Sequence, residues 1–425
     1  MIINSMKNII LKFIYRLLRK MARKVILCHN PFVIAVTGSV GKTSAKESIY
    51  QVLQENFGDQ VRASYGNLNA EIGIPLTILG YSKIPSKISW PFFLIAAWMR
   101  TFVSKYPRYL ILEMGIEHPG DIEYFGTIVN PDIGIITATT PAHVANFESL
   151  AAMQLEKIGM SKIIKKEGIT IVNLDDDILS KHKFINLISF AIKNHKADCL
   201  AENISITEQG TNYTIIYRQE KNSISTSILG EHLIYADLTA FCVGKKLNIS
   251  SEKIVLALEK QKSIPGRMNL LKGRDGVMII DDTYNSNPAS ARAALKTLSE
   301  IKYLTGRKVV ILGNMNELGS LEKEKHVEIA KYARGKCDLI IFSGSNAQAM
   351  YQAYDDKKTS LEFKNRSEII KSLDKIIKPS DIVLIKASQN NNYFEEITKE
   401  LLNDKSESEK VLVRQGKFWQ KKKKT

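Results

Sequence analysis

The sequence predicts an α/β protein with a largely parallel sheet. From Phe32 onward, short apolar runs of strand length alternate with helical patterns, as is typical of this class. Polar residues follow several of these runs, at the place where α/β proteins bind their ligands. A glycine-containing turn joins the first strand to the first helix after it. With 425 residues, the chain is long enough for two or three domains.

Four segments are expected in chain order. A basic amphipathic helix should occupy 1–30, and a central α/β domain 31–263, with alternating polar and β-branched residues at 200–230 forming an antiparallel meander at its side. A hinge-like segment, 263–267, should lead into a smaller Rossmann-like domain over 264–403, and a basic tail should follow over 404–425. In the smaller domain we expect strands near 276–281, 308–313, 338–342 and 381–385, alternating with helices near 288–300, 321–334, 366–377 and 391–403.

Two apolar stretches could contact a membrane. Apolar residues from Ile2 to Met21 recur at three- and four-residue steps, with lysine and arginine on the other face. Such a helix can lie in a membrane interface, or its stripe can dock on the protein's own core. The stretch from Trp90 to Met99 is too short to span a bilayer. It can be a buried helix, or its tryptophans and basic flanks can suit an interface.

Charge and cysteine usage narrow the function class. The net charge is +16, no acidic residue precedes Glu47, and the chain ends in a run of four lysines and a threonine, which suggests an anionic contact at both ends. Cysteines at 28, 199, 242 and 337 form no CxxC pair, so a reduced, cytoplasmic protein with buried thiols is expected. Basic residues are not interleaved with aromatic ones, which argues against nucleic-acid binding.

The turn after the first strand predicts a nucleotide-phosphate site. Glycines let backbone amides turn towards phosphate oxygens, and the helix N-terminus adds partial positive charge. Lys42 can reach the terminal phosphates and the Thr43 hydroxyl can hold Mg²⁺. The match to GxxxxGK is imperfect, because Val36 stands where the first glycine would be. The segment concerned is Thr37-Gly38-Ser39-Val40-Gly41-Lys42-Thr43-Ser44.

Three further side chains are candidate site residues. Glu113 ends one predicted strand, where a carboxylate suits a hard cation. His143 follows the strand at 133–136, and Lys157 lies in a helical stretch. Taken singly, they could equally be a capped loop acid, a hydrogen-bonded core histidine and a solvated lysine. Their occurrence together behind a phosphate loop favours a site.

Seven segments together resemble the Mur ligases, and most closely the branch that adds D-alanyl-D-alanine. The resemblance covers about residues 32–400, and order, spacing and strand-end context agree throughout. The segments are TGSVGKTS (37–44), GNLNAEIGIPLT (66–77), LEMGIEHPGDI (112–122), PAHVANFESL (141–150), PGRM (265–268), DDTYNSNPASARAAL (281–295) and LGNMNELGS (312–320).

The resemblance implies a role for each candidate residue. Lys42, Lys157 and His143 would be catalytic, and two Mg²⁺ sites are implied. The first would be held by Thr43, Ser44 and Glu113, and the second by His143, with Lys157 carrying a carbamate that supports the metal site. Asn67 and Asn69 would lie near the acceptor. ATP would be bound by Gly38, Ser39, Val40, Gly41, Lys42, Thr43, Ser44, Arg267, Asp282 and Asn285.

The implied function is an ATP-dependent ligase that joins a carboxylate to an amine through an acyl-phosphate. Its expected partners are a muropeptide-like carboxylate and an amino acid or dipeptide such as D-alanyl-D-alanine, in peptidoglycan synthesis. Two alternatives stay open: a related ligase using another or a lipid-linked acceptor at the membrane, and a non-catalytic nucleotide-binding scaffold. The expected location is the cytoplasm, with peripheral contact at the inner face of the membrane through 1–24 and the lysine tail.

Four departures from the family pattern bear on the substrate. About 30 residues precede the first strand, where similar enzymes carry a UDP-gripping domain that we expect this protein to lack. In the segment matching GxHNxxNA, Leu233 and Ala236 replace both asparagines, which puts the usual adenine contacts in doubt. Asn314 replaces a usual aspartate, and 386–390 reads KASQN where the family has a Lys-Gly-Ser-Arg pattern.

Overall fold

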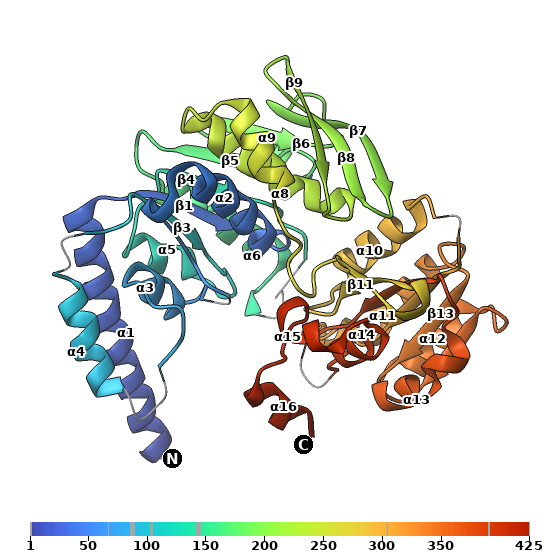
Figure 1. Cartoon of the computed structure of the whole chain (residues 1–425). Helices are drawn as coiled ribbons and strands as arrows, with labels where there is room; N and C mark the ends of the chain where they lie inside the picture. Colours follow the sequence, from blue (N-terminus) through green and yellow to red (C-terminus); the bar gives the residue numbers. More distant parts are fainter. Residues whose placement is uncertain are drawn as a thin grey trace. The chain divides into compact units, whose positions relative to one another are not determined.

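The structure is a computed structural model (Figure 1). It describes residues 2–66, 68–85, 90–102, 105–141, 146–303, 305–389 and 392–424, and the side chains of these except 2–10, 12, 91 and 424. Two predicted site residues, Asn67 and His143, lie outside the described residues. The predicted α/β class is confirmed, with two sheets and helices on their faces.

The first sheet has nine strands in the order β2-β3-β1-β4-β5-β6-β7-β8-β9. Every pair from β2 to β7 is parallel. Consequently the carboxyl ends of β1, β3, β4 and β5 reach the same edge. The strands are β1 (Phe32–Thr37), β2 (Val61–Ala63), β3 (Tyr109–Glu113), β4 (Ile133–Ile136), β5 (Ile169–Asn173), β6 (Leu187–Ala191), β7 (Cys199–Thr207), β8 (Gly210–Tyr217) and β9 (Glu220–Thr226).

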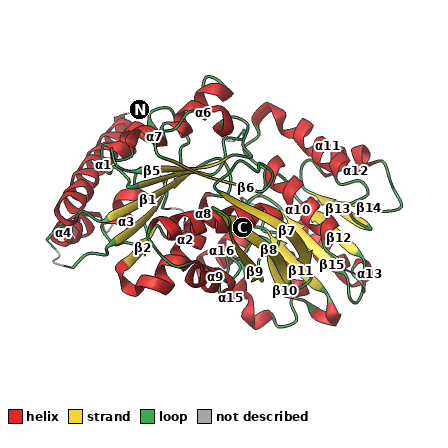
Figure 2. Cartoon of the chain, turned by 90° about the horizontal axis from the view of Figure 1, so that it is seen from above, coloured by secondary structure: helices red, strands yellow, loops and turns green. Residues whose placement is uncertain are grey.

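Both faces of the parallel strands are covered by helices, which is why they are apolar throughout. On one face, Val33 and Ala35 share a core with α1, α3 (Gly73–Ile78), α5 (Asp121–Gly126) and α7 (Met160–Ile163). The other face is covered by α2 (Lys42–Phe57), α8 (Glu231–Lys246) and α9 (Ser251–Glu259) (Figure 2). The helix α6 (Leu150–Ile158) follows β4 in the chain.

The predicted meander at 200–230 is present as β7, β8 and β9. Two-residue connections join these strands, so neighbours run antiparallel. Arg218 and Gln219 form the second connection with φ values of 46° and 77°. Two successive positive φ values fit the hairpin turns that match the twist of paired strands.

The N-terminal segment is one helix, α1 (Ile2–His29), whose apolar stripe docks on the core. Ile14, Leu18, Met21, Ala22 and Val25 are buried there. Of the two interpretations left open for this stripe, docking on the protein's own core therefore holds for the described side chains. The opposite side of α1 remains exposed, with Phe13 and Leu27 on it.

The second apolar stretch is α4 (Trp90–Arg100), which lies beside α1 (Figure 1). Only Ala97 is fully buried among its described side chains, while Trp90, Phe93 and Leu94 are partly buried against the core. Its remaining large apolar side chains are exposed. No helix in the described ranges is both long and apolar enough to cross a membrane.

The second sheet has six strands in the order β10-β11-β15-β12-β13-β14, parallel except for the β10–β11 pair. One face packs against α10, α11 and α12, and the other against α13 and α14. The elements are β10 (Asn269–Lys272), β11 (Met278–Asp282), α10 (Pro288–Glu300), β12 (Lys308–Leu312), α11 (Glu322–Tyr332), β13 (Leu339–Ser343), α12 (Ala347–Tyr354), β14 (Ser360–Phe363), α13 (Arg366–Ile376), β15 (Ile382–Lys386) and α14 (Glu395–Leu401).

The basic tail is folded against this second sheet's helices. It forms α15 (Ser408–Val411) and α16 (Lys417–Lys424). Arg414 and Lys423 both contact the buried carboxylate of Glu395, at 2.8 and 2.9 Å. Part of the tail's positive charge is thus neutralised within the protein.

By its internal contacts the chain divides into two units. The first comprises Met1–Glu202, Thr214–Ile224 and Ile234–Leu258, and the second Asn203–Tyr213, Ser225–Leu233 and Glu259–Thr425. The second unit therefore also takes in parts of the meander and the start of α8. The boundaries predicted near 31, 264 and 404 stay predictions.

Candidate nucleotide and metal site

The loop between β1 and α2 has the geometry of a phosphate cradle. Gly41 precedes α2 with φ 80°, and Gly38 has φ 142°, both in the region that favours glycine. A Cβ at Gly38 would lie 2.1 Å from Thr137 Oγ1, so a side chain there would collide with the neighbouring β4 end. Lys42 Nζ donates to Gly38 O at 2.6 Å, which places the ammonium group over the loop. The backbone of the loop and the ammonium group of Lys42 thus lie close together.

Glu113 ends β3 beside this loop. Its side chain is 2% exposed, and Oε1 accepts hydrogen bonds from Thr43 Oγ1 at 3.1 Å and Asn69 Nδ2 at 3.2 Å. The fold therefore brings together three residues that the sequence placed in separate segments. Thr43 comes from the helix start and Asn69 from the loop after β2. Ser44, which the sequence also selected, is buried next to Thr43 on α2.

One carboxylate oxygen of Glu113 has no hydrogen-bond donor among the described residues. This atom, Oε2, is buried, and Lys46 Nζ lies 3.9 Å from it. A buried carboxylate oxygen without a donor is costly unless a cation or another donor approaches it. Carboxylate and hydroxyl oxygens are the ligands Mg²⁺ prefers. Glu113, Thr43 and Ser44 therefore supply oxygen atoms of the kind that would suit a magnesium ion.

Lys46 is a functional candidate that the sequence analysis missed. It lies one turn after Lys42 on α2 and is fully buried. Its ammonium group donates to Ser64 O at 2.7 Å and pairs with Glu47 at 2.8 Å. The burial of Lys46 depends on β2 and β3 meeting α2, which no local pattern announces. Its ammonium group also lies 3.9 Å from Glu113 Oε2.

Lys157 is buried at the end of α6, with 1% of its surface exposed. Nζ donates to Ile116 O at 2.9 Å. Burial and, to a lesser extent, the positive charge of Lys42 lower the pKa of Lys157 to about 8, against the opposing effect of Glu117, Asp121 and Glu156. An exposed, solvated lysine, the plain alternative for this residue, is therefore excluded.

Hydrogen bonds from residues at the carboxyl ends of β4 and β5 hold the loop between β1 and α2 in place. Thr137 Oγ1 donates to Val40 O at 2.6 Å, and Asn173 Nδ2 donates to Thr137 O at 3.2 Å. Thr139 is held by Asp176 through Oγ1 at 2.8 Å. These bonds fix the loop's position relative to the sheet. Ser39 Oγ is buried and has no hydrogen-bond partner within the described ranges, so it can turn to a ligand.

The second unit holds its own cluster of predicted site residues. Asp282 Oδ2 accepts from the buried Lys386 Nζ at 2.6 Å, and Lys386 also donates to Asn285 O at 3.0 Å. Ser388 Oγ donates to Asn285 Oδ1 at 2.8 Å. The carboxyl ends of β11 and β15 are thereby tied to each other. Asp282 and Asn285 are both positioned by residues of the KASQN segment.

Arg267 lies over the aromatic ring of Tyr284, 4.5 Å from its centroid. The preceding Gly266 has φ 71°, and its N–H donates to Asp281 Oδ2 at 3.0 Å. Asp281 is fully buried, and burial raises its pKa to about 7. The hinge-like segment is thus fastened to β11, which sets the place of Arg267 within the unit.

The segment that departs from GxHNxxNA lies at the start of α8. Its last residue, Asp237, accepts a hydrogen bond from Ser48 Oγ at 2.9 Å, which ties α8 to α2. Tyr235 OH donates to Asp175 at 2.8 Å. His232 belongs to the second unit and is buried enough that its pKa falls to about 4. Of these side chains, Asp237 links α8 to α2, and Tyr235 links α8 to the loop after β5.

Two family models match the chain. The Mur ligase middle domain matches residues 36–244, and the glutamate ligase domain of Mur ligases matches residues 266–389. The first match contains the phosphate loop, Glu113 and Lys157. The second contains Arg267, Asp282 and Asn285.

Similar proteins point to one branch of that family. The UDP-N-acetylmuramoyl-tripeptide--D-alanyl-D-alanine ligase of Buchnera aphidicola subsp. Baizongia pistaciae is 31% identical over 367 residues, covering 85% of this chain and 73% of that protein. The Bacillus subtilis strain 168 enzyme of the same name is 28% identical, covering 87% and 76%. The MurF ligase of Thermotoga maritima in complex with ADP superposes with a TM-score of 0.77 at 26% identity, covering 93% and 84%. This chain therefore belongs to the Mur ligases, a family of ATP-dependent acid–amino-acid ligases.

Proposed function

We propose that this enzyme uses ATP to join D-alanyl-D-alanine, or a closely similar amine, to the carboxylate of a UDP-muramoyl-tripeptide through an acyl-phosphate. The relatives from Buchnera and Bacillus carry that substrate in their names. The observation that carries the proposal is the contact of Glu113 with both Thr43 and Asn69. That contact joins the nucleotide loop to the segment expected to face the acceptor.

The reaction divides between two bond changes. In the first, a substrate carboxylate oxygen attacks the γ-phosphorus of ATP, and ADP leaves. In the second, the neutral amine attacks the acyl carbon, the amide bond forms, and phosphate leaves with the amine's proton passing to a base. A carboxylate is a poor electrophile, so phosphorylation is what makes the amide step possible.

The phosphate loop stabilises the charge that builds on the transferring group. Backbone amides of 38–43 and the Lys42 ammonium group would bind the β- and γ-phosphates. Thr43, Ser44 and Glu113 would hold the Mg²⁺ ion, which neutralises phosphate charge when bound. A second magnesium on His143 is part of the same proposal. In the second unit, Arg267, Asp282 and Asn285 would bind phosphate and ribose.

Lys157 would act as a carbamate. Its neutral amine nitrogen adds to CO₂, one proton is released, and a buried cation becomes an anion. Only the unprotonated amine can react, and a pKa lowered to about 8 makes that form available near neutral pH. The product would place negative charge near Lys42, which exerts an electrostatic effect on Lys157.

A lipid-linked acceptor at a membrane surface is the second candidate. The observation that favours it is the exposed apolar and basic face formed by α1 and α4. In that case the enzyme would act as a peripheral protein, with the same chemistry at the phosphate loop. A non-catalytic scaffold is disfavoured because the Glu113 and Lys157 side chains are buried in the site.

The test is phosphate release from ATP and Mg²⁺ with purified protein. We expect turnover that requires both UDP-muramoyl-tripeptide and D-alanyl-D-alanine. Lys42→Ala should lower kcat by about 10²- to 10³-fold, because one charge-stabilising donor is lost. Lys181→Ala, an exposed lysine of the same unit, is the matched control and should behave as wild type. Turnover only with a lipid-linked acceptor would select the second candidate, and silence with both acceptors would refute the proposal.

The carbamate has a separate test. Protein equilibrated with ¹³C-bicarbonate should show a carbamate carbon resonance by NMR that disappears in Lys157→Arg. Removing bicarbonate should lower turnover, and restoring it should bring turnover back. A spectrum identical in wild type and Lys157→Arg would show that Lys157 stays an amine.

A further inference from the structure

The outer face of α1 and α4 is unusually apolar for a surface. Eight of the eighteen large apolar side chains that are exposed among the described residues lie in these two helices or at Phe102 just after them. On α4 and its continuation they share one helical face and are about 56% to 78% exposed: Phe92, Ile95, Met99 and Phe102. Because the core-facing stripe of α1 is already buried, these residues are additional to the core. An exposed apolar patch of this kind marks a surface that binds another molecule or a membrane.

This apolar face has cations beside it and no acidic residue in its own segments. Residues 1–46 and 72–112 contain no aspartate or glutamate. On α1, Arg16, Lys20, Arg23 and Lys24 are exposed. Lys24 Nζ lies 4.0 Å from the ring centroid of Phe102, so the cation row and the apolar face adjoin. An apolar strip next to a cation row is the pattern of helices that lie in the interface of an anionic bilayer.

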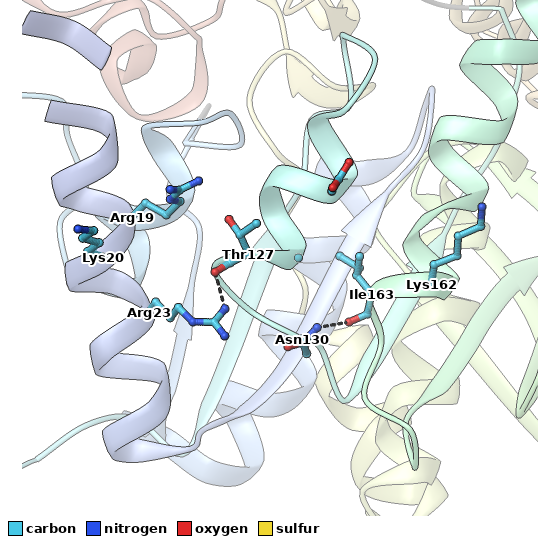
Figure 3. A pocket seen from close by; sticks show the side chains of 9 residues that line it. Arg19, Lys20, Arg23, Thr127, Asn130, Lys162 and Ile163 are labelled. Atoms are coloured by element: carbon cyan, nitrogen blue, oxygen red, sulfur yellow. Dashed lines mark hydrogen bonds between the residues drawn. The ribbon is translucent and has the colours of Figure 1, made fainter. Parts of the chain in front are cut away.

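A basic pocket opens beside the same cation row (Figure 3). It has a volume of about 630 Å³ and is lined by Arg19, Lys20 and Arg23 of α1 and by Lys162 of α7, with Glu123 as its one acidic lining residue. Within the part of the chain that is described, none of these four cations forms an ion pair with a carboxylate. The arrangement offers more positive charge than the protein itself neutralises.

Polar groups of the pocket wall are arranged around these cations. Arg23 Nη1 donates to Thr127 O at 2.5 Å, which holds one guanidinium group against the wall. Asn130 Nδ2 donates to Ile163 O at 2.9 Å on the far side (Figure 3). Arg19 lies over the Tyr124 ring, 5.8 Å from its centroid. Lys20 remains exposed at the rim and can meet an anion that enters from outside.

We propose that the α1–α4 face is a docking surface for an anionic phospholipid bilayer, and that the pocket at Arg19, Lys20, Arg23 and Lys162 receives a lipid phosphate headgroup. The apolar side chains of α4 would enter the interface while the α1 cations contact phosphates. None of the described helices can cross the bilayer, so the contact is peripheral. A protein partner would have to be acidic and apolar together, and a second copy of this chain would oppose like charges.

The experiment is flotation of the full chain with two kinds of vesicle, without ATP or substrate. One is phosphatidylcholine alone, and the other is equal parts phosphatidylcholine and phosphatidylglycerol. We expect at least about tenfold tighter binding to the anionic vesicles, because the α1 cations are attracted to the negative surface, and this binding should weaken as salt is raised. The Trp98 fluorescence should shift to shorter wavelength on binding, and Trp98→Phe should remove most of the shift.

Two variants test the two halves of the surface. Ile95→Ser with Met99→Ser should lower binding to anionic vesicles about tenfold or more, and so should Lys20→Glu with Arg23→Glu. The matched control is Lys181→Glu with Lys193→Glu, two exposed lysines of the same unit. It makes the same charge change and should bind as wild type. Unchanged thermal midpoints in all variants exclude unfolding as the cause.

Three outcomes would overturn the proposal. The first is wild-type protein that floats with neither vesicle. The second is equal loss in the control and the α1 variant, which would show that net charge alone decides. The third is a dimer in sedimentation that Ile95→Ser with Met99→Ser converts to monomer without changing vesicle binding, which would assign the face to a second copy. Because no substrate is present, failure here leaves the proposed ligase activity untouched.

Discussion

Lys157 shows what one buried amine does to this site. Burial and the charge of Lys42 both oppose its protonated form, so its pKa falls to about 8 from 10.5. An exposed lysine is almost entirely protonated at neutral pH, whereas a pKa of about 8 gives Lys157 a neutral fraction that can react. The nearby carboxylates of Glu117, Asp121 and Glu156 limit the fall.

The lowered pKa makes a prediction about stability and pH. The unfolded chain binds more protons than the folded one between the folded pKa of about 8 and the unfolded value of 10.5, so the contribution of Lys157 to stability rises with pH through that window. The unfolding free energy of wild type, relative to that of Lys157→Met, should therefore rise by up to about 3 kcal/mol between pH 8 and 10.5. Urea denaturation in CO₂-free buffer measures this difference. A difference that is flat with pH would show that Lys157 is protonated in the folded protein.

At the residue scale the sequence indicated side chains but not their partners. Lys42, Glu113 and Lys157 could be selected because each follows a recognisable segment. Lys46 could not, since its burial arises where α2 meets β2 and β3. Lys386 belongs to a segment that the family resemblance did select, but its bond to Asp282 joins segments about a hundred positions apart and could not be predicted.

At the element scale, the basic tail shows that composition alone does not predict how a charged segment packs. A run of lysines is normally a solvated surface, and for this one the sequence predicts a contact with something anionic, such as a membrane surface. In the fold, Lys423 pairs with Glu395 and Glu396 at 2.9 and 2.6 Å. Glu395 itself is fully buried and takes two hydrogen bonds from Arg414. Glu396 and Glu395 precede Lys423 by 27 and 28 residues, too far for a local pattern to connect them.

We expect the packing of the tail against the second unit to depend on Arg414. Its guanidinium group also donates to Thr283 O at 2.6 Å and Tyr284 O at 3.2 Å, beside Asp282. Arg414→Ala would leave a buried carboxylate with less compensation, which costs about 3–5 kcal/mol. Urea denaturation should show that loss, and the KM for ATP should rise.

Two further variants test that account. Lys405→Ala removes only an exposed pair with Glu400 and should change stability by less than about 0.5 kcal/mol. Arg414→Met combined with Glu395→Gln should recover part of the loss, because the unpaired charge is removed. An Arg414→Ala variant as stable as wild type would place the tail outside the folded unit.

The predicted bounds of helices and strands agree best with the structure where the local sequence signals are strong. Helix α10 occupies the predicted span, since Asn287 caps it by accepting from Ser290 N and Pro288 follows as its first residue. The sequence pattern did not predict β10, β14 or α12, each of which has eight residues or fewer. Short edge strands carry too few residues for a two-residue period to appear, and pairing across the sheet decides them.

At the scale of the whole molecule, the fold class and family followed from the order of segments along the chain. Alternation of strands and helices predicted the parallel sheets, and seven motifs predicted the family. Composition predicted an excess of positive charge at the ends, but not how it is used. At the N-terminal end, α1 carries a row of exposed cations. At the C-terminal end, part of the positive charge is neutralised by ion pairs within the second unit.

Nucleotide binding should stabilise the whole chain in a metal-dependent way. At a hundred times its Kd, a ligand adds about 2.7 kcal/mol, so Mg²⁺ with a non-hydrolysable ATP analogue should raise the thermal midpoint. Glu113→Gln should lose most of the part that depends on Mg²⁺, since a neutral amide is a weaker ligand for a hard cation. The rise seen with nucleotide and a chelator should be the same in both proteins. An unchanged magnesium effect in Glu113→Gln would remove Glu113 from the metal site.

The docked tail has a practical consequence for anyone who prepares this protein. Lys423 lies close to the C-terminus, and its ammonium group is nearly buried against Glu395 and Glu396. A purification tag fused there would have to leave from a packed surface, and trimming the lysines as disordered would expose two carboxylates. Since α1 presents the proposed lipid surface at the other end, an N-terminal tag would interfere with vesicle assays. A cleavable N-terminal tag, removed before any measurement, is the arrangement that this fold recommends.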